Sequence, residues 1–334
     1  MRAPAFWGKS EPTLPALLLQ PFGFLYGRVT AARMRQKPRA AAAVPVICVG
    51  NFIAGGAGKT PTAIALAERL TAMGQSPAFL TRGYGGKTAG PHIVNTESDT
   101  AADVGDEALL LAAHAPTIVS RKRPAGAALA EKTGASVIIM DDGFQNPSLK
   151  KDCSLIAIDG TYGVGNGLSI PAGPLRAPVE AQMPEADALV IVGSAAESDR
   201  TQKLRDEAQK LGRPVFETRS EATCKKDLKD VRVLAFAGIG RPEKFFATVE
   251  TLGGDVVTAK AFPDHHPYSP EDARAILDLS ERGGLLPVTT AKDAARFKGS
   301  RKLDILRERT SVVDLKAVFD DPDGLSRLLA PLFG

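Results

Sequence analysis

A lysine and a threonine stand together after a glycine-rich loop, a combination that can bind the phosphates of a nucleotide. Residues 51–60 read N-F-I-A-G-G-A-G-K-T, between an apolar, β-branched run and a helical pattern over 61–73. This order of strand, glycine loop and helix points backbone N–H groups and a helix N-terminus at phosphate oxygens. Lys59 would reach the β- and γ-phosphates, and the Thr60 hydroxyl would hold Mg²⁺.

One position of the loop departs from the usual phosphate-binding pattern. The pattern G-x-x-x-x-G-K-[ST] has glycine where Ile53 stands, and the glycines that follow could compensate for it. A glycine turn with an accidental Lys-Thr is the alternative, but the flanking strand and helix argue against it. The expected nucleotide-binding residues are Ile53, Ala54, Gly55, Gly56, Ala57, Gly58, Lys59 and Thr60, with Arg121 as a further cation.

Two acids follow the apolar strand pattern 137–140, in the sequence D-D-G-F-Q. An acid at the end of such a strand, downstream of a phosphate loop, is typical of the second Mg²⁺ ligand. Successive strand residues face opposite ways, so Asp141 and Asp142 are expected to differ in role. Which of them binds the metal stays open, and a purely structural turn is the alternative.

Residues suited to acid–base chemistry lie in two further places. Asp106 and Glu107 open a helical pattern, where carboxylates often only complement the helix dipole. His265 and His266 follow Asp264 in the proline-flanked loop F-P-D-H-H-P-Y. Histidine titrates near neutral pH, so this loop is as good a candidate for function as for structure.

Cations and polar residues stand where other expected strands end. The carboxyl edge of an open α/β sheet is where ligands bind, which makes these residues candidates for substrate or phosphate contacts. Ordinary solvated turns are the alternative at each position. The candidates are Arg82 and Tyr84 in R-G-Y-G-G, Arg121 in R-K-R, Gln145 in D-D-G-F-Q and Arg176 in P-A-G-P-L-R-A-P.

The alternation of strand and helix patterns predicts an α/β protein with two lobes. We expect a P-loop NTPase-type three-layer sandwich over residues 41–152, completed by a C-terminal helix within 318–334. A second, smaller α/β lobe over 153–317 would close over the ATP-binding cleft. Residues 1–40 form a separate N-terminal segment.

The composition excludes some classes of protein. A net charge of +4 on 334 residues is too small to indicate a nucleic-acid partner. The three cysteines, Cys48, Cys153 and Cys224, are scattered and show neither pair spacing nor metal-ligand spacing, which suits a reducing compartment.

The first forty residues are apolar and basic. The stretch 14–26 is too short, and too interrupted by proline and glycine, to span a bilayer. The basic residues follow the apolar stretch, which is not the order of a cleavable signal. Aromatic residues, followed by five Arg or Lys between Arg28 and Arg39, indicate a segment that lies in a membrane interface. A helix packed on the protein's own core and a cleaved transit peptide are the alternatives.

Seven motifs together resemble the tetraacyldisaccharide 4'-kinase family, the lipid A 4'-kinases. The combination of G-G-A-G-K-T-P with D-D-G-F-Q is specific to the family. The shorter motifs are weak alone but support the resemblance when they occur together with these two. Ala177 and Ala291 depart from residues that the family often has there. In the family's order, the motifs are G-N-F-I-A-G-G-A-G-K-T-P (50–61), T-R-G-Y-G-G (81–86), V-G-D-E (104–107), D-D-G-F-Q (141–145), P-A-G-P-L-R-A-P (171–178), F-P-D-H-H (262–266) and T-A-K-D (290–293).

The resemblance implies a Gram-negative enzyme at the cytoplasmic face of the inner membrane, where its N-terminal helix contacts the lipid. It implies transfer of the ATP γ-phosphoryl group, with Mg²⁺, to the 4'-hydroxyl of a tetraacylated glucosamine disaccharide 1-phosphate, which yields lipid IVA. Neither a nucleic acid nor an obligate protein partner is expected.

The resemblance also implies roles for single residues. Asp106 would accept the hydroxyl proton with the help of His265, and His266 is the second choice for that histidine. Because the acid and the histidine lie in different lobes, closure of the lobes would assemble the pair. Lys59 and Arg121 would offset the charge that develops during transfer.

Three other functions stay open. A membrane-tethered nucleotide switch would need the guanine-binding motif N/T-K-x-D, whereas residues 290–293 read T-A-K-D with the wrong spacing. A soluble ATP-dependent kinase or ligase for another small molecule would leave the basic, aromatic N-terminal segment without a purpose. A non-catalytic lipid-binding module would tolerate the loss of Lys59.

Overall fold

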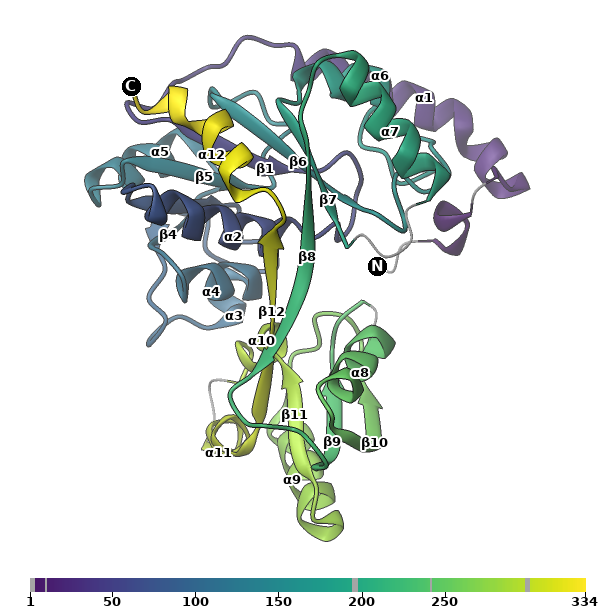
Figure 1. Cartoon of the computed structure of the whole chain (residues 1–334), viewed down its shortest axis with the longest axis vertical. Helices are drawn as coiled ribbons and strands as arrows, with labels where there is room; N and C mark the ends of the chain where they lie inside the picture. The colour runs from purple at the N-terminus through teal and green to yellow at the C-terminus, as the bar shows by residue number, and fades with distance from the viewer. Residues whose placement is uncertain (1–3, 10, 194–197, 241, 298–300) are drawn as a thin grey trace.

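One continuous sheet connects two lobes of the molecule (Figure 1). The computed structural model describes residues 4–9, 11–193, 198–240, 242–297 and 301–334, and across these ranges the sheet has twelve strands. In order across the sheet they are β10 (Asp255–Ala261), β9 (Arg232–Ala237), β11 (Leu286–Thr290), β12 (Ser311–Phe319), β8 (Val215–Cys224), β7 (Ala188–Val192), β6 (Cys153–Asp159), β1 (Val46–Gly50), β5 (Val137–Asp141), β2 (Pro77–Thr81), β4 (Thr117–Val119) and β3 (His92–Ile93).

The larger lobe is a mainly parallel sheet, with the short strand β3 antiparallel at its edge, and it is covered on both faces. Its central strands are continuous apolar runs because both faces are buried. Val46 and Cys48 of β1 face one core, and Ile47 and Val49 face the other. The first core is covered by α5 (Arg123–Lys132) and α7 (Asp199–Lys210), and the second by α2 (Lys59–Ala72) and α12 (Pro322–Leu329). This confirms the expected three-layer α/β fold.

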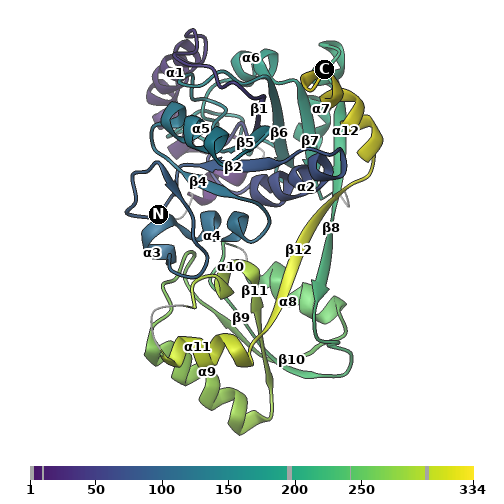
Figure 2. The same cartoon turned by 90° about the vertical axis from the view of Figure 1, so that its left-hand side faces the viewer.

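The smaller lobe is built on β9, β10 and β11, which are parallel to one another. Two long strands, β8 and β12, pair antiparallel and connect it to the larger lobe as a ribbon (Figure 2). Its helices are α8 (Pro242–Thr251), α9 (Pro270–Gly283), α10 (Ala291–Ala294) and α11 (Arg301–Arg309).

The boundary between the lobes lies later in the chain than the sequence led us to expect. β6 pairs with β1 and β7 pairs with β6, so residues 153–192 continue the sheet of the larger lobe instead of starting the second one. The cause is that β6 is as apolar as β1 and needs cover on both faces. The C-terminal helix α12 completes the larger lobe, since Arg69 of α2 donates to Asp323 at 2.7 Å.

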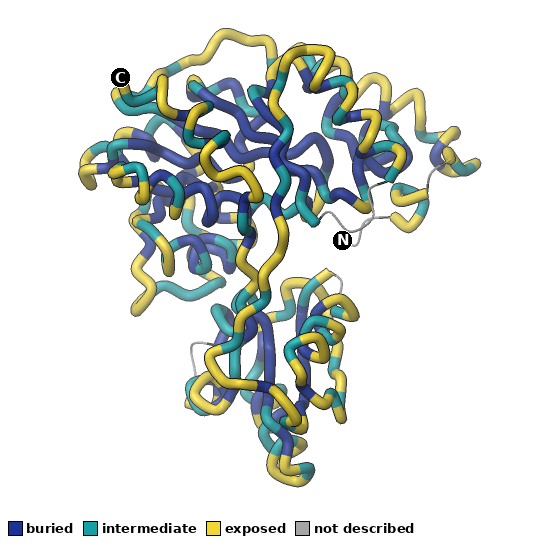
Figure 3. The backbone as a smooth tube through the Cα atoms, viewed as in Figure 1, coloured by how far each residue is buried: buried dark blue, intermediate teal, exposed yellow. Residues whose placement is uncertain are grey.

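The N-terminal helix α1 (Leu14–Met34) packs on the larger lobe through small residues. Ala16, Gly23 and Gly27 are buried, and a Cβ added at Gly23 would lie 2.6 Å from the carbonyl oxygen of Ser169. Eight large apolar or aromatic side chains of α1 are exposed, whereas Leu19 and Met34 are half-buried. Figure 3 colours much of this helix as exposed. No helix within the described ranges is both long and apolar enough to cross a membrane, and residues 1–3 and 10 lie outside those ranges. The remaining short helices are η1 (Ala5–Gly8), α3 (Ala101–Val104), α4 (Asp106–Ala112), α6 (Val179–Gln182), η2 (Met183–Glu185) and η3 (Ala330–Leu332).

Candidate active site

The glycine-rich loop connects β1 to α2 and leads directly into the first turn of the helix. Gly58 precedes the first helical residue with φ +80°, a left-handed conformation that glycine adopts without strain. A Cβ added at Gly58 would lie 2.8 Å from Val192 Cγ1, so this position has no room for a side chain. Lys59 Nζ donates to the carbonyl oxygen of Gly55 at 3.2 Å, which holds the lysine charge over the loop.

Ile53 fits this loop although the usual pattern has glycine at its position. It is buried and forms an antiparallel bridge with Leu175, and the N–H of Ala54 donates to the carbonyl oxygen of Pro174 at 2.7 Å. The isoleucine side chain therefore belongs to the core. The left-handed turns of the loop lie at glycines further along, of which Gly55 has φ +118°.

The two acids at the end of β5 have different surroundings. Asp141 is buried, and among the residues that the structure describes its Oδ1 has no hydrogen-bond partner. Burial, together with the charges of Glu107 and Asp142, raises the pKa of Asp141 to about 7. The Asp142 carboxylate accepts two bonds from Arg176, at 2.7 and 3.0 Å. Burial opposes the charge of Asp142, but Lys59 and Arg176 outweigh it and lower the pKa of this carboxyl.

Two arginines brace the acidic turn. Arg123 is buried beneath it, and its Nη2 lies 3.4 Å from the carbonyl oxygens of both acids. Arg176 Nε donates to the carbonyl oxygen of Ile53 at 3.0 Å, so it ties the turn to the phosphate loop. Gln145 joins this network, because its Oε1 accepts from Arg176 at 3.1 Å and its Nε2 donates to Asn51 at 2.7 Å. The structure thus places Arg176 and Gln145 beside the phosphate loop.

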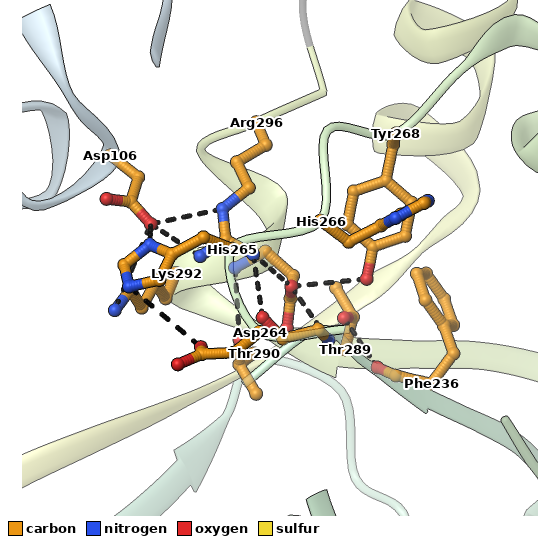
Figure 4. A network of polar contacts seen from close by, with 12 residues as sticks. Asp106, Phe236, Asp264, His265, His266, Tyr268, Thr289, Thr290, Lys292 and Arg296 are labelled. Carbon is orange, nitrogen blue, oxygen red and sulfur yellow. Dashed lines mark hydrogen bonds and ion pairs between the residues drawn. The ribbon is translucent and has the colours of Figure 1, made fainter. Parts of the chain in front are cut away.

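A polar cluster joins the two lobes around Asp106, the first residue of α4 (Figure 4). This carboxylate is 5% exposed, and His265 Nδ1 lies 3.0 Å from its Oδ2. Arg296 donates to the same oxygen from Nε at 3.1 Å and also from Nη2, and Lys292 Nζ lies 3.9 Å away. Burial opposes the charge, but His265, Lys292 and Arg296 hold the pKa of Asp106 well below its ordinary value. The acid–histidine contact, expected to form on closure, is already made in this structure.

His265 and the other histidine of its loop have different environments. His265 has φ +58°, an uncommon conformation for a residue with a side chain. His266 is directed into the smaller lobe, where its Nε2 lies 2.9 Å from Asp272 Oδ2 and its ring stacks on Phe262 with centroids 4.7 Å apart. Of the two histidines, His265 is therefore the one that meets Asp106.

Two further candidates lie on the loop after β2, and a third, Arg121, follows β4 and contacts this loop. Tyr84 is exposed, and its ring meets that of His265 edge to face with centroids 6.2 Å apart. Arg82 is exposed in the same loop. Arg121 Nη2 donates to the carbonyl oxygen of Gly86 at 3.3 Å. Of these three side chains, Tyr84 is the one that meets the polar cluster between the lobes.

Lys292, Asp293 and Arg296 also belong to this cluster, although no role for them follows from the sequence alone. Asp293 is fully buried and accepts hydrogen bonds from the Gly238 N–H and the Tyr268 hydroxyl. The available signal was the spacing of Asp293 and Arg296, an acid and an arginine three residues apart, which form an ion pair at 2.8 Å. Such pairs are common on exposed helices, so the spacing alone could not mark a buried one.

The comparison of sequences points to one family. The sequence model of the family described as "Tetraacyldisaccharide-1-P 4'-kinase" matches residues 15–333. A relative named tetraacyldisaccharide 4'-kinase, from Methylorubrum extorquens, is 49% identical over 334 residues, which are 100% of this chain and 99% of the relative. Another of the same name, from Rhodopseudomonas palustris, is 51% identical over 299 residues, 89% of this chain and 87% of that one.

A solved structure agrees with this result. The crystal structure of the "apo" form of LpxK from Aquifex aeolicus in complex with ATP superimposes with a TM-score of 0.75 at 28% identity. The match covers 96% of this chain and 99% of that one, so both lobes are shared. The chain therefore belongs to the tetraacyldisaccharide 4'-kinase family, as its motifs predicted.

Proposed function

We propose that the chain transfers the γ-phosphoryl group of ATP to the 4'-hydroxyl of a tetraacylated disaccharide 1-phosphate, which completes lipid IVA. The observation that carries the proposal is the contact of 3.0 Å between Asp106 and His265, in a chain that also has a phosphate loop. A sugar hydroxyl is a poor nucleophile at neutral pH and needs a base beside it. Membership of the family supports this choice of acceptor.

The nucleotide is assigned to residues 53–60. Lys59 now donates to the carbonyl oxygen of Gly55, and it would exchange that bond for phosphate oxygens of the bound nucleotide. The relative from Aquifex aeolicus, whose structure is described as a complex with ATP, supports the choice of this nucleotide. Arg121, at the end of β4, is a further cation that could offset charge on the transferred group.

The residues near the loop suit a nucleotide-bound Mg²⁺. Within the described ranges no three His, Cys, Asp or Glu side chains are grouped to hold a metal, and Mg²⁺ bound to nucleotides commonly takes only one or two protein ligands. The unpartnered, buried Oδ1 of Asp141 and the hydroxyl of Thr60 at the start of α2 fit that role. Asp142, already paired with Arg176, is the weaker candidate. When bound, Mg²⁺ would offset the negative charge of the β- and γ-phosphates.

Asp106 is assigned as the group that accepts the proton of the 4'-hydroxyl. As the hydroxyl oxygen bonds to the γ-phosphorus, the bond from that phosphorus to the ADP oxygen breaks and the proton moves to the carboxylate. His265 would donate from Nδ1 to Asp106 Oδ2, which keeps the carboxylate oriented and charged until the hydroxyl arrives.

The acceptor headgroup is assigned to the side chains that flank this pair. Arg82 and Tyr84 lie on the exposed loop that reaches His265, where a sugar ring or its phosphate could contact them. Arg176 and Gln145 lie on the nucleotide side, and we propose that they contact the acceptor close to the transferred group.

The lipid chains are assigned to the surface of α1. Eight of its apolar or aromatic side chains are exposed, and five Lys or Arg follow between Arg28 and Arg39. Such a helix can lie in a membrane interface while its basic residues meet anionic headgroups. We therefore place the enzyme at the cytoplasmic face of the inner membrane, with no membrane-spanning segment required.

The purified chain, incubated with γ-labelled ATP, Mg²⁺ and the tetraacylated disaccharide 1-phosphate in detergent, tests the proposal. We expect label in the lipid product, and its loss in the variants Lys59→Ala and Asp106→Asn. A matched control is His92→Gln, because His92 and Asp99 form another acid–histidine pair, 2.7 Å apart, on the same lobe. Absence of labelled lipid from the wild type would refute the kinase assignment.

One feature argues against a nucleotide switch. In the sequence T-A-K-D, Asp293 is buried and bonded to Thr290 and Arg296, so its carboxylate is engaged within the smaller lobe. A guanine-binding acid must instead present both oxygens to the base. If the chain bound GTP and ATP equally well and phosphorylated no lipid, a nucleotide switch would become the better assignment than a kinase.

A further inference from the structure

Arg296 is a buried arginine that contacts both lobes. Its side chain is 4% exposed. From the smaller lobe it is held by two acceptors, the Gly238 carbonyl oxygen at 2.9 Å and Asp293 Oδ1 at 2.8 Å, both bound by Nη1. Its other two nitrogens, Nε and Nη2, donate to Oδ2 of Asp106 in the larger lobe. The guanidinium group of Arg296 therefore connects the smaller lobe directly to Asp106, the proposed base.

We propose that Arg296 is a positioning residue for phosphoryl transfer, which fixes the orientation of Asp106 and makes it depend on the placement of the smaller lobe. This inference rests on the proposed function, since it concerns the same carboxylate. It gives a role to a residue that the nucleotide and the acceptor need not touch.

The bonding of Asp106 shows how Arg296 selects one of its oxygens. Oδ2 is the acceptor for Arg296 and lies 3.0 Å from His265 Nδ1. For Oδ1, the bond found within the described part of the chain comes from the N–H of Glu107, at 2.9 Å. A carboxylate oxygen can accept more than one hydrogen bond, so Oδ1 keeps a place for a hydroxyl proton. Because Oδ2 is already bonded to Arg296 and lies next to His265, Oδ1 is the oxygen that can accept the proton of the lipid 4'-hydroxyl.

Charge is the second contribution of Arg296. Burial of Asp106 favours the neutral form, which could not accept a proton. The bond to His265 and the charges of Lys292 and Arg296 reverse this and keep the pKa of Asp106 low. The charged groups that contact this carboxylate are His265, Lys292 and Arg296. Their own acidic partners nearby are Asp264 beside His265, Glu107 beside Lys292, and Asp293 beside Arg296.

The geometry explains why arginine suits this position. The planar guanidinium offers donors on two sides, so it can bind Asp293 and Asp106 at the same time. A lysine would supply the charge but only a single nitrogen, and could not hold both carboxylates in the same arrangement. Charge and orientation can therefore be separated by substitution.

The test is a comparison of Arg296→Gln and Arg296→Lys in lipid phosphorylation across pH. For Arg296→Gln we expect kcat to fall about tenfold or more, with KM for ATP unchanged within about twofold, because the phosphate loop is separate. The acid limb of its kcat profile should move up by about one pH unit, because a neighbouring cation is lost. Arg296→Lys should keep the wild-type acid limb and show an intermediate kcat.

The control is Arg309→Gln, since Arg309 forms an exposed ion pair with Glu281 within the smaller lobe and should behave as wild type. A purely structural Arg296 would lower the amount of folded enzyme without moving the acid limb. Equal acid limbs in Arg296→Gln and the wild type, or in Arg296→Gln and Arg296→Lys, would overturn the proposal. If circular dichroism shows that Arg296→Gln is unfolded, Arg296→Lys decides: reduced kcat at unchanged KM supports positioning, and wild-type kcat overturns it.

This outcome can be separated from failure of the proposed function. An inactive wild type, or full activity in Asp106→Asn, would defeat the kinase or base assignment itself. An active wild type, an inactive Asp106→Asn and an unaffected Arg296→Gln would defeat only the positioning role.

Discussion

Asp141 and Asp142 are neighbours in the chain, yet their electrostatic environments differ. The Asp142 carboxylate is paired with Arg176, whereas among the described residues the buried Asp141 carboxylate forms no ion pair and its Oδ1 accepts no hydrogen bond. A buried carboxyl of this kind favours the protonated form until a cation arrives. The contrast supports Asp141 over Asp142 as the metal ligand and leads to a prediction about stability.

Without Mg²⁺ and nucleotide, Asp141 should make the folded protein less stable as pH rises. Its folded pKa of about 7 lies above the unfolded value of about 3.9, so its contribution is fully present below pH 4 and is lost as pH rises through 7. The loss amounts to about 4 kcal/mol for three pKa units. Asp141→Asn should therefore unfold at higher urea than the wild type at pH 8, and at similar urea at pH 4, with a chelator present.

Asp142→Asn is the matched comparison for this experiment. Because its pKa is lowered by Lys59 and Arg176, removal of its charge should destabilise the protein at neutral pH. An Asp141→Asn variant that is no more stable than the wild type at pH 8 would contradict the raised pKa of Asp141, because the ionised carboxylate would then cost the folded state nothing measurable.

Residues differ in how far the sequence revealed their roles. The phosphate loop is local, so a single stretch carried its chemistry. Asp106 and His265 are 159 positions apart, and their contact was expected only through the family resemblance. Arg296 lies 190 positions from Asp106, and no local sequence pattern predicts a buried ion pair between the two lobes. Long-range pairing depends on the packing of the lobes, which spacing along the chain does not encode.

At the scale of elements, α1 has two faces of different character. Small residues contact the larger lobe, while Phe22 and Leu25 are 65% and 63% exposed. Exposed apolar side chains in such number are unusual unless another surface covers them. The anionic membrane that we propose as its site supplies such a surface.

Substitution of the exposed apolar residues should separate membrane binding from folding. Each large apolar side chain contributes about 1.5–3 kcal/mol when it is removed from water. The double variant Phe22→Ser, Leu25→Ser should therefore bind anionic vesicles about tenfold or more weakly in co-sedimentation, with an unchanged melting temperature. Leu211→Ser, at an exposed apolar residue after α7, should bind as wild type. Equal vesicle binding by the double variant would refute a membrane role for this face.

Strands were predicted well where they are buried and poorly where they are not. The apolar runs of β1, β5 and β6 have the continuous hydrophobic pattern of central parallel strands. β8 begins with an apolar stretch, but it continues through polar residues to Cys224 because it pairs with β12. β12 contains exposed charged residues such as Lys316 and β10 is an edge strand, so neither has the apolar signal of a strand.

At the scale of the whole molecule, two kinds of connection hold the lobes together. The ribbon of β8 and β12 is a covalent connection that is largely exposed between the lobes (Figure 3). The polar cluster around Asp106, with the contact of Lys292 and Glu107 at 3.5 Å, is the second connection. The relative placement of the lobes should therefore respond to the charge of one carboxylate.

Asp106→Ala should let the lobes separate in solution. The substitution removes the acceptor for Arg296 and His265, while Arg296 keeps its partners Asp293 and Gly238 in the smaller lobe, so that lobe stays folded. Small-angle X-ray scattering should give a larger radius of gyration, and protease should cut the ribbon faster.

Arg309→Gln, which alters an ion pair inside the smaller lobe, provides the control and should scatter as the wild type does. An unchanged radius of gyration in Asp106→Ala would show that the ribbon alone sets the distance between the lobes. In that case the contact between Arg296 and Asp106 would not determine how the lobes are placed. The position of the smaller lobe could then not set the orientation of Asp106. A larger radius would instead mean that one buried charge governs both the chemistry and the closure of the cleft.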